Sequence, residues 1–273
     1  MKREEKIKLL LDKTEYSFDD LVTIVEVLRS EGGCPWDMEQ THKSIRKDFI
    51  EETYEVIEAI DTDNPVLLRE ELGDVLLQVV FHARISEEEK NFDINGVAND
   101  ICAKLIHRHP HVFGNVDAKT TDEVLKNWDA IKSEEKSRIT FTDKLKSIPP
   151  MLPALMRATK VGKKAKCFDF PTASDVMVKI SEELAEVSEA IEENNTEHIF
   201  EEIGDLLLSI TSLCRKLGVD AEESLSKATD KFINRFEAIE TEVLKQNKTM
   251  EECTLEELDQ IWDKNKQKSQ KNL

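Results

Sequence analysis

The chain has 273 residues, of which 39% are hydrophobic and 35% are charged, and its formal net charge is -19. This length allows one large or two ordinary domains. Eight glycines and seven prolines are too few for a turn-dense β sandwich or barrel, so we expect a soluble, helix-rich protein. The acidic balance argues against non-specific nucleic-acid binding, which needs Lys and Arg to neutralise phosphates.

The sequence predicts a cytoplasmic location and no membrane partner. The N-terminus is charged and no signal-peptide apolar core follows it. No apolar run approaches bilayer length. The cysteines show no CxxC spacing and are interpreted as reduced thiols: Cys34, Cys102, Cys167, Cys214 and Cys253.

Helical patterns fill the first half of the chain. Ser17 is a predicted N-cap, with acidic residues in the first turn after it, and Gly32-Gly33 stops the run. Asn64 and Pro65 supply a cap and a proline at the first helical position. The further helices expected in this half cover about 42–61, 65–90, 93–108 and 121–138.

The second half repeats this plan after a break that contains Pro149-Pro150. We therefore predict an N-terminal domain over 1–139, a linker over 140–150 and a C-terminal domain over 151–273. Gly218 fits a C-cap, and Thr254 with Glu257 fits a capping box. The expected helices are 152–166, 173–193, 196–217, 220–247 and 255–267.

One acidic pattern occurs twice with the same internal spacing. The first copy reads Glu51-Glu52-Thr53-Tyr54-Glu55, then Glu70-Glu71-Leu72-Gly73-Asp74. The second copy reads Glu182-Glu183-Leu184-Ala185-Glu186, then Glu201-Glu202-Ile203-Gly204-Asp205. A match in residue type, order and spacing indicates two copies of one unit.

Each copy predicts a divalent-metal site on a helical hairpin. Acids three residues apart share a helix face, and the midpoint of each pattern falls at a helix break, Asp63 or Asn194. Folding there brings four carboxylates to matching levels, where they repel unless cations lie between them. Such oxygen ligands suit Mg²⁺ or Mn²⁺. The predicted ligands are Glu52, Glu55, Glu71 and Asp74, and Glu183, Glu186, Glu202 and Asp205. The alternative is a solvated acidic face.

The residues beside the last acid of each copy support this interpretation. Asp74 and Asp205 each open a run that is apolar nearly all round, which predicts burial. Gly73 and Gly204 weaken a helix, so they suggest close approach of another helix or a ligand.

Cationic and aromatic residues also repeat after each acidic hairpin. Lys104 with Arg108 and Lys231 with Arg235 stand four apart, as do Trp128 with Lys132 and Trp262 with Lys266. Lys and Arg would bind phosphate oxygens, and Trp would pack near a base or ribose. The alternative for the Lys/Arg pairs is a solvent-exposed helix face, and the alternative for the tryptophans is an ordinary packing role in the core.

Two further motifs carry weaker signals. His107-Arg108-His109-Pro110-His111 has no usual zinc spacing and no thiolate nearby, so zinc is the weaker interpretation. Cys34-Pro35-Trp36-Asp37 is interpreted as a compact structural turn or substrate loop.

Together these residues resemble the MazG family of nucleoside triphosphate pyrophosphohydrolases over most of the chain. The carriers are Gly33-Cys34-Pro35-Trp36-Asp37, Glu39-Gln40-Thr41, both parts of the first acidic pattern, Arg108-His109-Pro110-His111-Val112-Phe113 and Leu152-Pro153-Ala154-Leu155-Met156-Arg157-Ala158. The resemblance implies an all-α tandem repeat of two MazG-like helical domains. It also implies a homodimer whose helices pack as four-helix-type bundles.

The resemblance further implies Mg²⁺-dependent cleavage of nucleoside triphosphates to monophosphate and pyrophosphate, mainly in the second domain. Its catalytic residues would be Glu183, Glu186, Glu202, Asp205, Lys231 and Arg235, with Trp262 and Lys266 binding substrate. The chain departs from the family pattern at Cys167, Thr229 and Asn234. We hypothesise a metal-activated water as nucleophile. The alternatives are a regulatory nucleotide-binding module with one or both sites inactive and a purely structural helical dimer.

Overall fold

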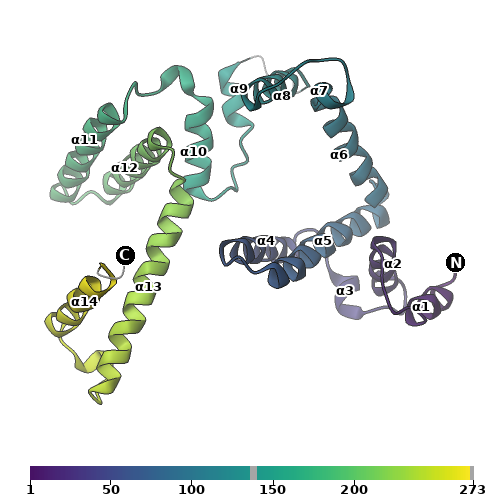
Figure 1. Cartoon of the computed structure of the whole chain (residues 1–273), viewed down its shortest axis with the longest axis horizontal. Helices are drawn as coiled ribbons and strands as arrows, with labels where there is room; N and C mark the ends of the chain where they lie inside the picture. Colours follow the sequence, from purple (N-terminus) through teal and green to yellow (C-terminus); the bar gives the residue numbers. More distant parts are fainter. Residues whose placement is uncertain (136–139, 271–273) are drawn as a thin grey trace. The chain divides into compact units, whose positions relative to one another are not determined.

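The computed structural model describes residues 1–135 and 140–270, except for the side chains of 129, 133–135 and 265–270. All the regular structure in this part of the chain is helical, which confirms the all-α prediction. The chain divides into two compact units, Met1–Glu135 and Lys136–Leu273 (Figure 1).

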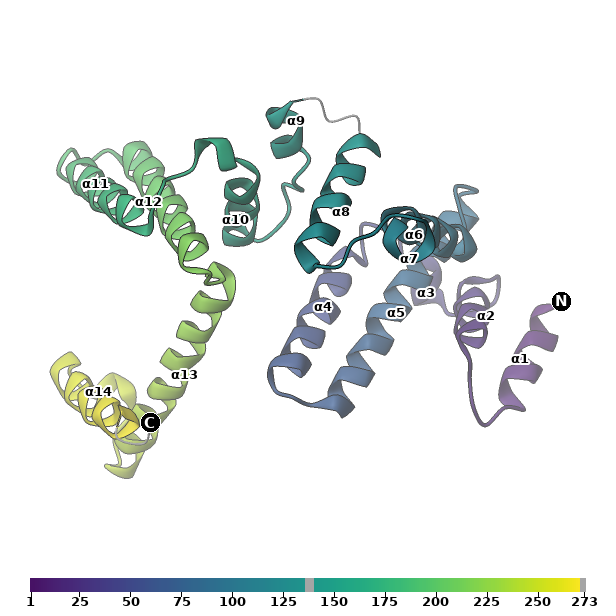
Figure 2. The same cartoon turned by 45° about the horizontal axis from the view of Figure 1, so that its top comes forward.

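Each unit contains one long helical hairpin. The helices of the first unit are α1 Arg3–Leu11, α2 Phe18–Arg29, α3 Pro35–Glu39, α4 Arg46–Asp61, α5 Pro65–Glu88, α6 Ile94–Arg108, α7 Pro110–Phe113 and α8 Thr121–Glu135. Those of the second unit are α9 Phe141–Lys146, α10 Ala154–Lys164, η1 Lys166–Phe168, α11 Ala173–Glu192, α12 Thr196–Leu217, α13 Ala221–Lys245, η2 Met250–Glu252 and α14 Leu255–Gln270. The hairpins are α4–α5 and α11–α12, whose helices lie side by side (Figure 2).

The two hairpins turn at the predicted residues. Asp63 and Asn194 both have a left-handed backbone, with φ of 50° and 51°. The next residue in each copy, Asn64 or Asn195, caps the following helix by accepting hydrogen bonds from two backbone N–H groups. The predicted hinge is therefore confirmed in both copies.

Other predicted helix ends are also confirmed. Ser17 and Asp20 form a capping box at the start of α2. Gly218 ends α12 with φ of 70°, a conformation that favours glycine. The Thr254 hydroxyl accepts from the Glu257 N–H at 3.3 Å, as a capping box requires.

The Cys34 motif forms a short helix, α3, where the sequence predicted only a turn. Pro35 opens α3 at its first position. Gly33 precedes it, and a Cβ there would lie 2.2 Å from the Leu28 carbonyl oxygen. Arg29 holds this segment because its guanidinium donates to the Gln40 carbonyl at 3.1 Å and pairs with Glu88 on α5 at 2.8 Å.

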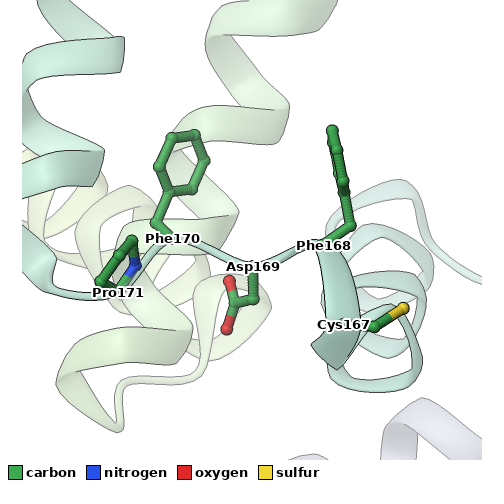
Figure 3. A pocket seen from close by; sticks show the side chains of 5 residues that line it. All are labelled: Cys167, Phe168, Asp169, Phe170 and Pro171. Carbon is green, nitrogen blue, oxygen red and sulfur yellow. The ribbon is translucent and has the colours of Figure 1, made fainter.

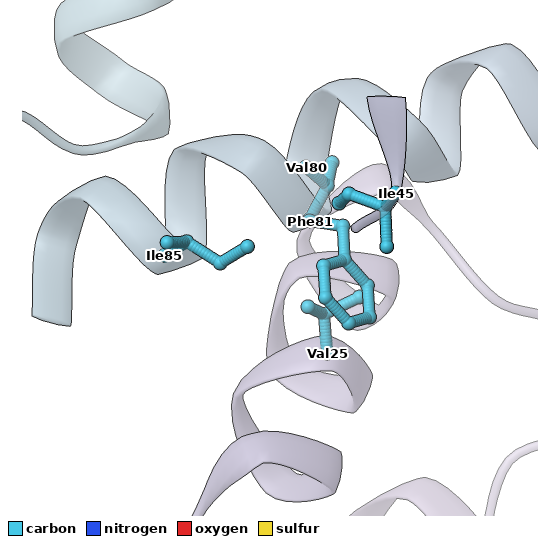
Figure 4. Packing of buried hydrophobic residues seen from close by; sticks show 5 residues of the cluster. All are labelled: Val25, Ile45, Val80, Phe81 and Ile85. Atoms are coloured by element: carbon cyan, nitrogen blue, oxygen red, sulfur yellow. The ribbon is translucent and has the colours of Figure 1, made fainter. Parts of the chain in front are cut away.

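The core of the first unit lies where α2 crosses the second half of α5. It consists of Val25, Ile45, Val80, Phe81 and Ile85 (Figure 4). This cluster fixes the end of α5 that follows the acidic residues, so the hairpin extends from a packed base.

The prediction of burial is wrong for part of both apolar runs. Leu207 and Leu208 are each 47% exposed and Leu76 is 40% exposed, whereas Val80 and Phe81 are buried. In the second unit, the physical reason is that α12 packs on α10 and α11, which leaves another of its faces uncovered by the described chain. A Cβ at Gly73 or Gly204 would meet no described atom within 4 Å, so no helix of the described chain makes the close approach predicted at these glycines.

The predicted linker 140–150 contains α9, which packs against α10 and is grouped with the second unit. Thr140 caps α9 in a capping box with Asp143. The domain limits 1–139, 140–150 and 151–273 stay a prediction. Among the described residues, no helix has the length and apolar character needed to cross a membrane.

Candidate active site

The hairpin of the first unit gathers three glutamates. Glu52 and Glu55 come from α4 and Glu71 from α5, and each offers a carboxylate oxygen within 4.8 Å of the other two. Burial and the nearby charge of Asp74 raise the pKa of Glu52 to about 7. Burial and the charge of Glu55 also raise the pKa of Glu71. This crowding of like charges is the arrangement that a bound cation relieves.

The hairpin of the second unit gathers the equivalent glutamates. Oxygens of Glu183 and Glu186 on α11 and of Glu202 on α12 lie within 4.8 Å of one another. Glu183 is only 4% exposed. Burial raises the pKa of Glu186, Lys179 opposes that shift, and the charges of Glu183 and Glu202 add to it.

Two basic side chains contact the second cluster, and sequence reasoning missed both. The Lys179 ammonium lies 2.8 Å from the Glu183 carboxylate, and His198 Nε2 lies 3.1 Å from Glu202. Hydrogen bonds to carboxylates raise the pKa of both groups, mainly that to Glu183 for Lys179 and that to Glu193 for His198. Each residue precedes its cluster glutamate by four positions, and this spacing was the available signal.

The fourth acid of each predicted set lies outside its cluster. Asp74 and Asp205 each follow the α5 or α12 glutamate by three residues, so they share its helix face. Asp74 is close enough to Glu52 to raise its pKa, whereas Asp205 is exposed. Their role as metal ligands stays a prediction.

The repeated Arg and Trp residues contact each other in both units. The guanidinium of Arg108 on α6 lies 5.4 Å from the ring centre of Trp128 on α8. The guanidinium of Arg235 on α13 lies 5.5 Å from the ring centre of Trp262 on α14. Both distances suit a cation–π contact, so the repeated order in sequence produces a repeated contact in space.

The structure describes the side chains of three of the four lysines that accompany these Arg and Trp residues. Lys104 and Lys231 are exposed and Lys132 is half-buried, while the side chain of Lys266 lies outside the described residues. No hydrogen bond or ion pair among the described residues joins Lys231 or Arg235 to the second carboxylate cluster. The acidic hairpin and the Arg–Trp pair are therefore two separate parts of the second unit.

An apolar recess adjoins the second Arg–Trp pair. It is lined by Phe232, Phe236, Ile239, Met250, Leu255, Leu258, Asp259 and Trp262. The Trp262 ring packs on Phe232 with ring centres 5.4 Å apart. An apolar recess with an aromatic wall beside a guanidinium can accept a flat ring that carries a phosphate chain.

A second recess is lined by the loop Cys167–Pro171, in which Cys167 departs from the family pattern (Figure 3). Asp169 anchors this loop to α12, because its carboxylate contacts Arg215 at 2.7 Å and Lys216 at 2.8 Å. Its pKa is held well below the usual range, mainly by the hydrogen bond from Arg215. Phe168 is left 95% exposed.

His109, in the 107–111 run, has protein partners. His109 lies edge-on to Trp128 with ring centres 4.9 Å apart, and its Nδ1 is 2.6 Å from the Leu105 carbonyl. Among the described residues, neither of the groups able to hold a metal ion includes a histidine.

Comparison with known proteins decides the family. The model of the MazG nucleotide pyrophosphohydrolase domain matches the chain twice, over residues 40–113 and 172–239. The chain belongs to the MazG family. The matched residues include both carboxylate hairpins and the two Lys/Arg pairs, and they end before Trp128 and Trp262.

Full-length relatives agree with this assignment. The chain is 45% identical to the nucleoside triphosphate pyrophosphohydrolase/pyrophosphatase MazG of Thermotoga maritima, over 91% of this chain and 95% of the relative. It is 42% identical to the nucleoside triphosphate pyrophosphohydrolase of Escherichia coli K12, over 89% and 95%. It is 39% identical to the uncharacterized protein YabN of Bacillus subtilis, over 92% of this chain and 52% of that protein.

Proposed function

We propose that this MazG protein hydrolyses nucleoside triphosphates to nucleoside monophosphate and pyrophosphate, with Mg²⁺ as cofactor and Mn²⁺ as a possible substitute. One water is consumed, and the bond between the α- and β-phosphates breaks. The names of the relatives and the double family match support the reaction class. The observation that carries the proposal is the convergence of three carboxylates at equivalent positions in both hairpins.

The chemistry of the two clusters fits a divalent cation. Each offers three carboxylate oxygens within 4.8 Å, and hard oxygen donors are what Mg²⁺ and Mn²⁺ prefer. Glu183, Glu186 and Glu202, joined by Asp205, would hold the metal in the second unit, and Glu52, Glu55, Glu71 and Asp74 would do so in the first. Bound there, Mg²⁺ would neutralise phosphate charge and lower the pKa of a nucleophilic water.

The cationic helices are assigned to the substrate. Lys231 and Arg235 would bind phosphate oxygens and stabilise charge that develops on them during bond cleavage. Trp262, which forms one wall of the apolar recess, would contact the base or ribose, and Lys266 would add a further cation. Lys104, Arg108, Trp128 and Lys132 would bind substrate in the first unit. We assign the main catalytic role to the second unit.

A homodimer would cover the uncovered face of the second hairpin. Leu207 and Leu208 are nearly half exposed, and Gly204 on the same helix leaves room for a close approach. Such apolar exposure on a two-helix hairpin is relieved when two hairpins pack as a four-helix bundle. Measurement of the mass in solution by light scattering tests this point, and a monomer at micromolar concentration would refute it.

Product analysis tests the function. Purified protein is mixed with a panel of nucleoside triphosphates and Mg²⁺, and the nucleotide products are separated. Monophosphate with pyrophosphate supports the proposal and ranks the substrates. Diphosphate with phosphate, or no turnover of any nucleotide by folded protein, overturns it. Calorimetric binding without turnover would instead indicate a regulatory nucleotide-binding module.

A further inference from the structure

One cation lies inside the carboxylate cluster of the second unit. The Lys179 ammonium is 2.8 Å from Glu183, 2.9 Å from Glu182 and 4.0 Å from Glu186. Its side chain is 31% exposed, and the Glu183 side chain that it contacts is only 6% exposed. Lys179 therefore contacts the most buried glutamate of the cluster directly.

The first unit has no counterpart of this lysine. Lys179 precedes Glu183 by four residues on α11, and the residue four before Glu52 on α4 is Asp48. Among the described residues, no ion pair joins a Lys, Arg or His to Glu52, Glu55 or Glu71. Two clusters with the same three glutamates thus differ by a fixed positive charge.

This difference has a direct electrostatic consequence. A divalent ion that enters the second cluster must either displace the ammonium from Glu183 or bind beside it, and both cost free energy. An ion that enters the first cluster meets carboxylates without that competitor. The carboxylates alone therefore predict similar metal affinities, whereas the carboxylates together with Lys179 predict different ones.

We propose that Lys179 is a resident cation that competes with divalent metal at the second carboxylate cluster, so that this cluster binds free metal more weakly than the first. The inference rests on the proposed function, because it takes the clusters to be metal sites. As a consequence, the second unit binds metal mainly together with the triphosphate. The phosphate oxygens supply further metal ligands and can form an ion pair with the displaced Lys179 ammonium.

The test measures binding of Mn²⁺ alone to the full chain, with free Mn²⁺ followed by electron paramagnetic resonance. The Glu52→Gln/Glu55→Gln variant, which we call the parent, should no longer bind Mn²⁺ at the first cluster. The Mn²⁺ binding isotherm of the parent therefore reports the second cluster. Adding Lys179→Gln should tighten the Mn²⁺ Kd at least about tenfold, because a charge repelling the divalent ion at contact distance is lost. Adding Lys179→Arg keeps the charge and should leave the Kd near the parent value.

A matched control removes the same charge elsewhere. Lys245 on α13 pairs with Glu242 and contacts no residue of either cluster. Adding Lys245→Gln to the parent should leave the Kd unchanged. A tightening equal to that of Lys179→Gln would show an effect of net charge alone and would overturn the inference.

The reciprocal change is made in the first unit. In a Glu183→Gln/Glu186→Gln background, Asp48→Lys places an ammonium four residues before Glu52 and should weaken Mn²⁺ binding at least about tenfold relative to Asp48→Asn. This arm decides the question if Lys179→Gln disrupts folding, as judged by circular dichroism. The inference is overturned if Lys179→Gln and Lys179→Arg give equal Kd values and Asp48→Lys and Asp48→Asn do so too. Absence of Mn²⁺ binding to either folded background overturns the metal sites themselves.

Discussion

The two carboxylate hairpins share a backbone design and differ in electrostatics. Both turn at a left-handed residue followed by an Asn cap, and both bring three glutamates within 4.8 Å. In the first unit, burial and like charges raise the pKa of Glu52 to about 7. In the second unit, Lys179 and His198 contact the glutamates. Burial and repulsion within the first cluster thus raise the pKa of Glu52 and Glu71, whereas Lys179 and His198 contact the glutamates of the second.

The difference shows that a repeated motif does not fix the properties of a repeated site. The residues that distinguish the copies lie one helical turn outside the motif, where the second copy has Lys179 and His198 and the first has Asp48 and Leu67. We expect metal affinity, pH response and division of labour between the units to depend on these neighbours as well as on the glutamates.

The largest expected effect separates the two clusters by activity. Glu183→Gln/Glu186→Gln should lower kcat for pyrophosphate release at least about 100-fold, because it removes charge from the site assigned to the metal. Glu52→Gln/Glu55→Gln is the matched change in the first unit and should cost less than tenfold. Equal losses in the two variants would contradict the assignment of the main catalytic role to the second unit.

A second prediction concerns the anchoring ion pairs of each unit. Asp169→Asn should destabilise the second unit by about 2 kcal/mol, because the shielded Arg215 and Lys216 lose their carboxylate partner. Glu88→Gln in the first unit should cost about 1 kcal/mol or less, since Glu88 is more exposed than Asp169 and the buried Arg29 keeps its hydrogen bonds to the Asp37 and Gln40 carbonyls. Amide hydrogen exchange resolved by unit measures both, and a larger effect at Glu88 would reverse the comparison.

The pH dependence of stability should differ between metal-free and metal-bound protein. The pKa of Glu52 is raised above its unfolded value in the folded protein, so the folded state binds this proton more tightly. The contribution of Glu52 to stability is therefore full below about pH 4.5 and is lost as pH rises towards about 7. In EDTA, the first unit should lose thermal stability between pH 5 and about 7.5, and saturating Mg²⁺ should suppress the loss. Glu52→Gln should reduce the slope and leave the part that comes from the raised pKa of Glu71, and an unchanged slope would disprove the assignment to Glu52.

The smallest expected effect concerns the aromatic residues. Trp262→Leu should raise KM several-fold with a smaller change in kcat, because it removes an aromatic wall of the recess and the partner of Arg235. Trp128→Leu is the matched change in the first unit and should leave both parameters nearly unchanged. Steady-state kinetics with one triphosphate measure both, and the opposite ranking would move substrate binding to the first unit.

The sequence predicted those parts of the structure that depend on local spacing. Helical periodicity, the Asn caps and the midpoints of the acidic patterns located both hairpins and their turns. The chain also contains α1 and α9, which the sequence analysis did not predict. α1 is short and charged, and α9 lies in a segment whose prolines suggested a linker.

Other features depended on contacts that local spacing does not encode. The apolar run after Asp205 predicted burial, but Leu207 and Leu208 remain nearly half exposed because nothing in the described chain covers that face. Spacing alone did not predict the roles of Lys179 and His198, because i,i+4 pairs are common on solvent-exposed helices. Only the hairpin geometry shows that the glutamates these two side chains contact belong to the carboxylate cluster.

We place the metal-dependent centre of pyrophosphohydrolysis at the second carboxylate cluster. The decisive experiment uses Glu52→Gln/Glu55→Gln protein with one nucleoside triphosphate, first in EDTA and then after Mg²⁺ is restored. We expect no product in EDTA, and monophosphate with pyrophosphate once Mg²⁺ is present. Turnover in EDTA, or products that are diphosphate and phosphate, would contradict this assignment.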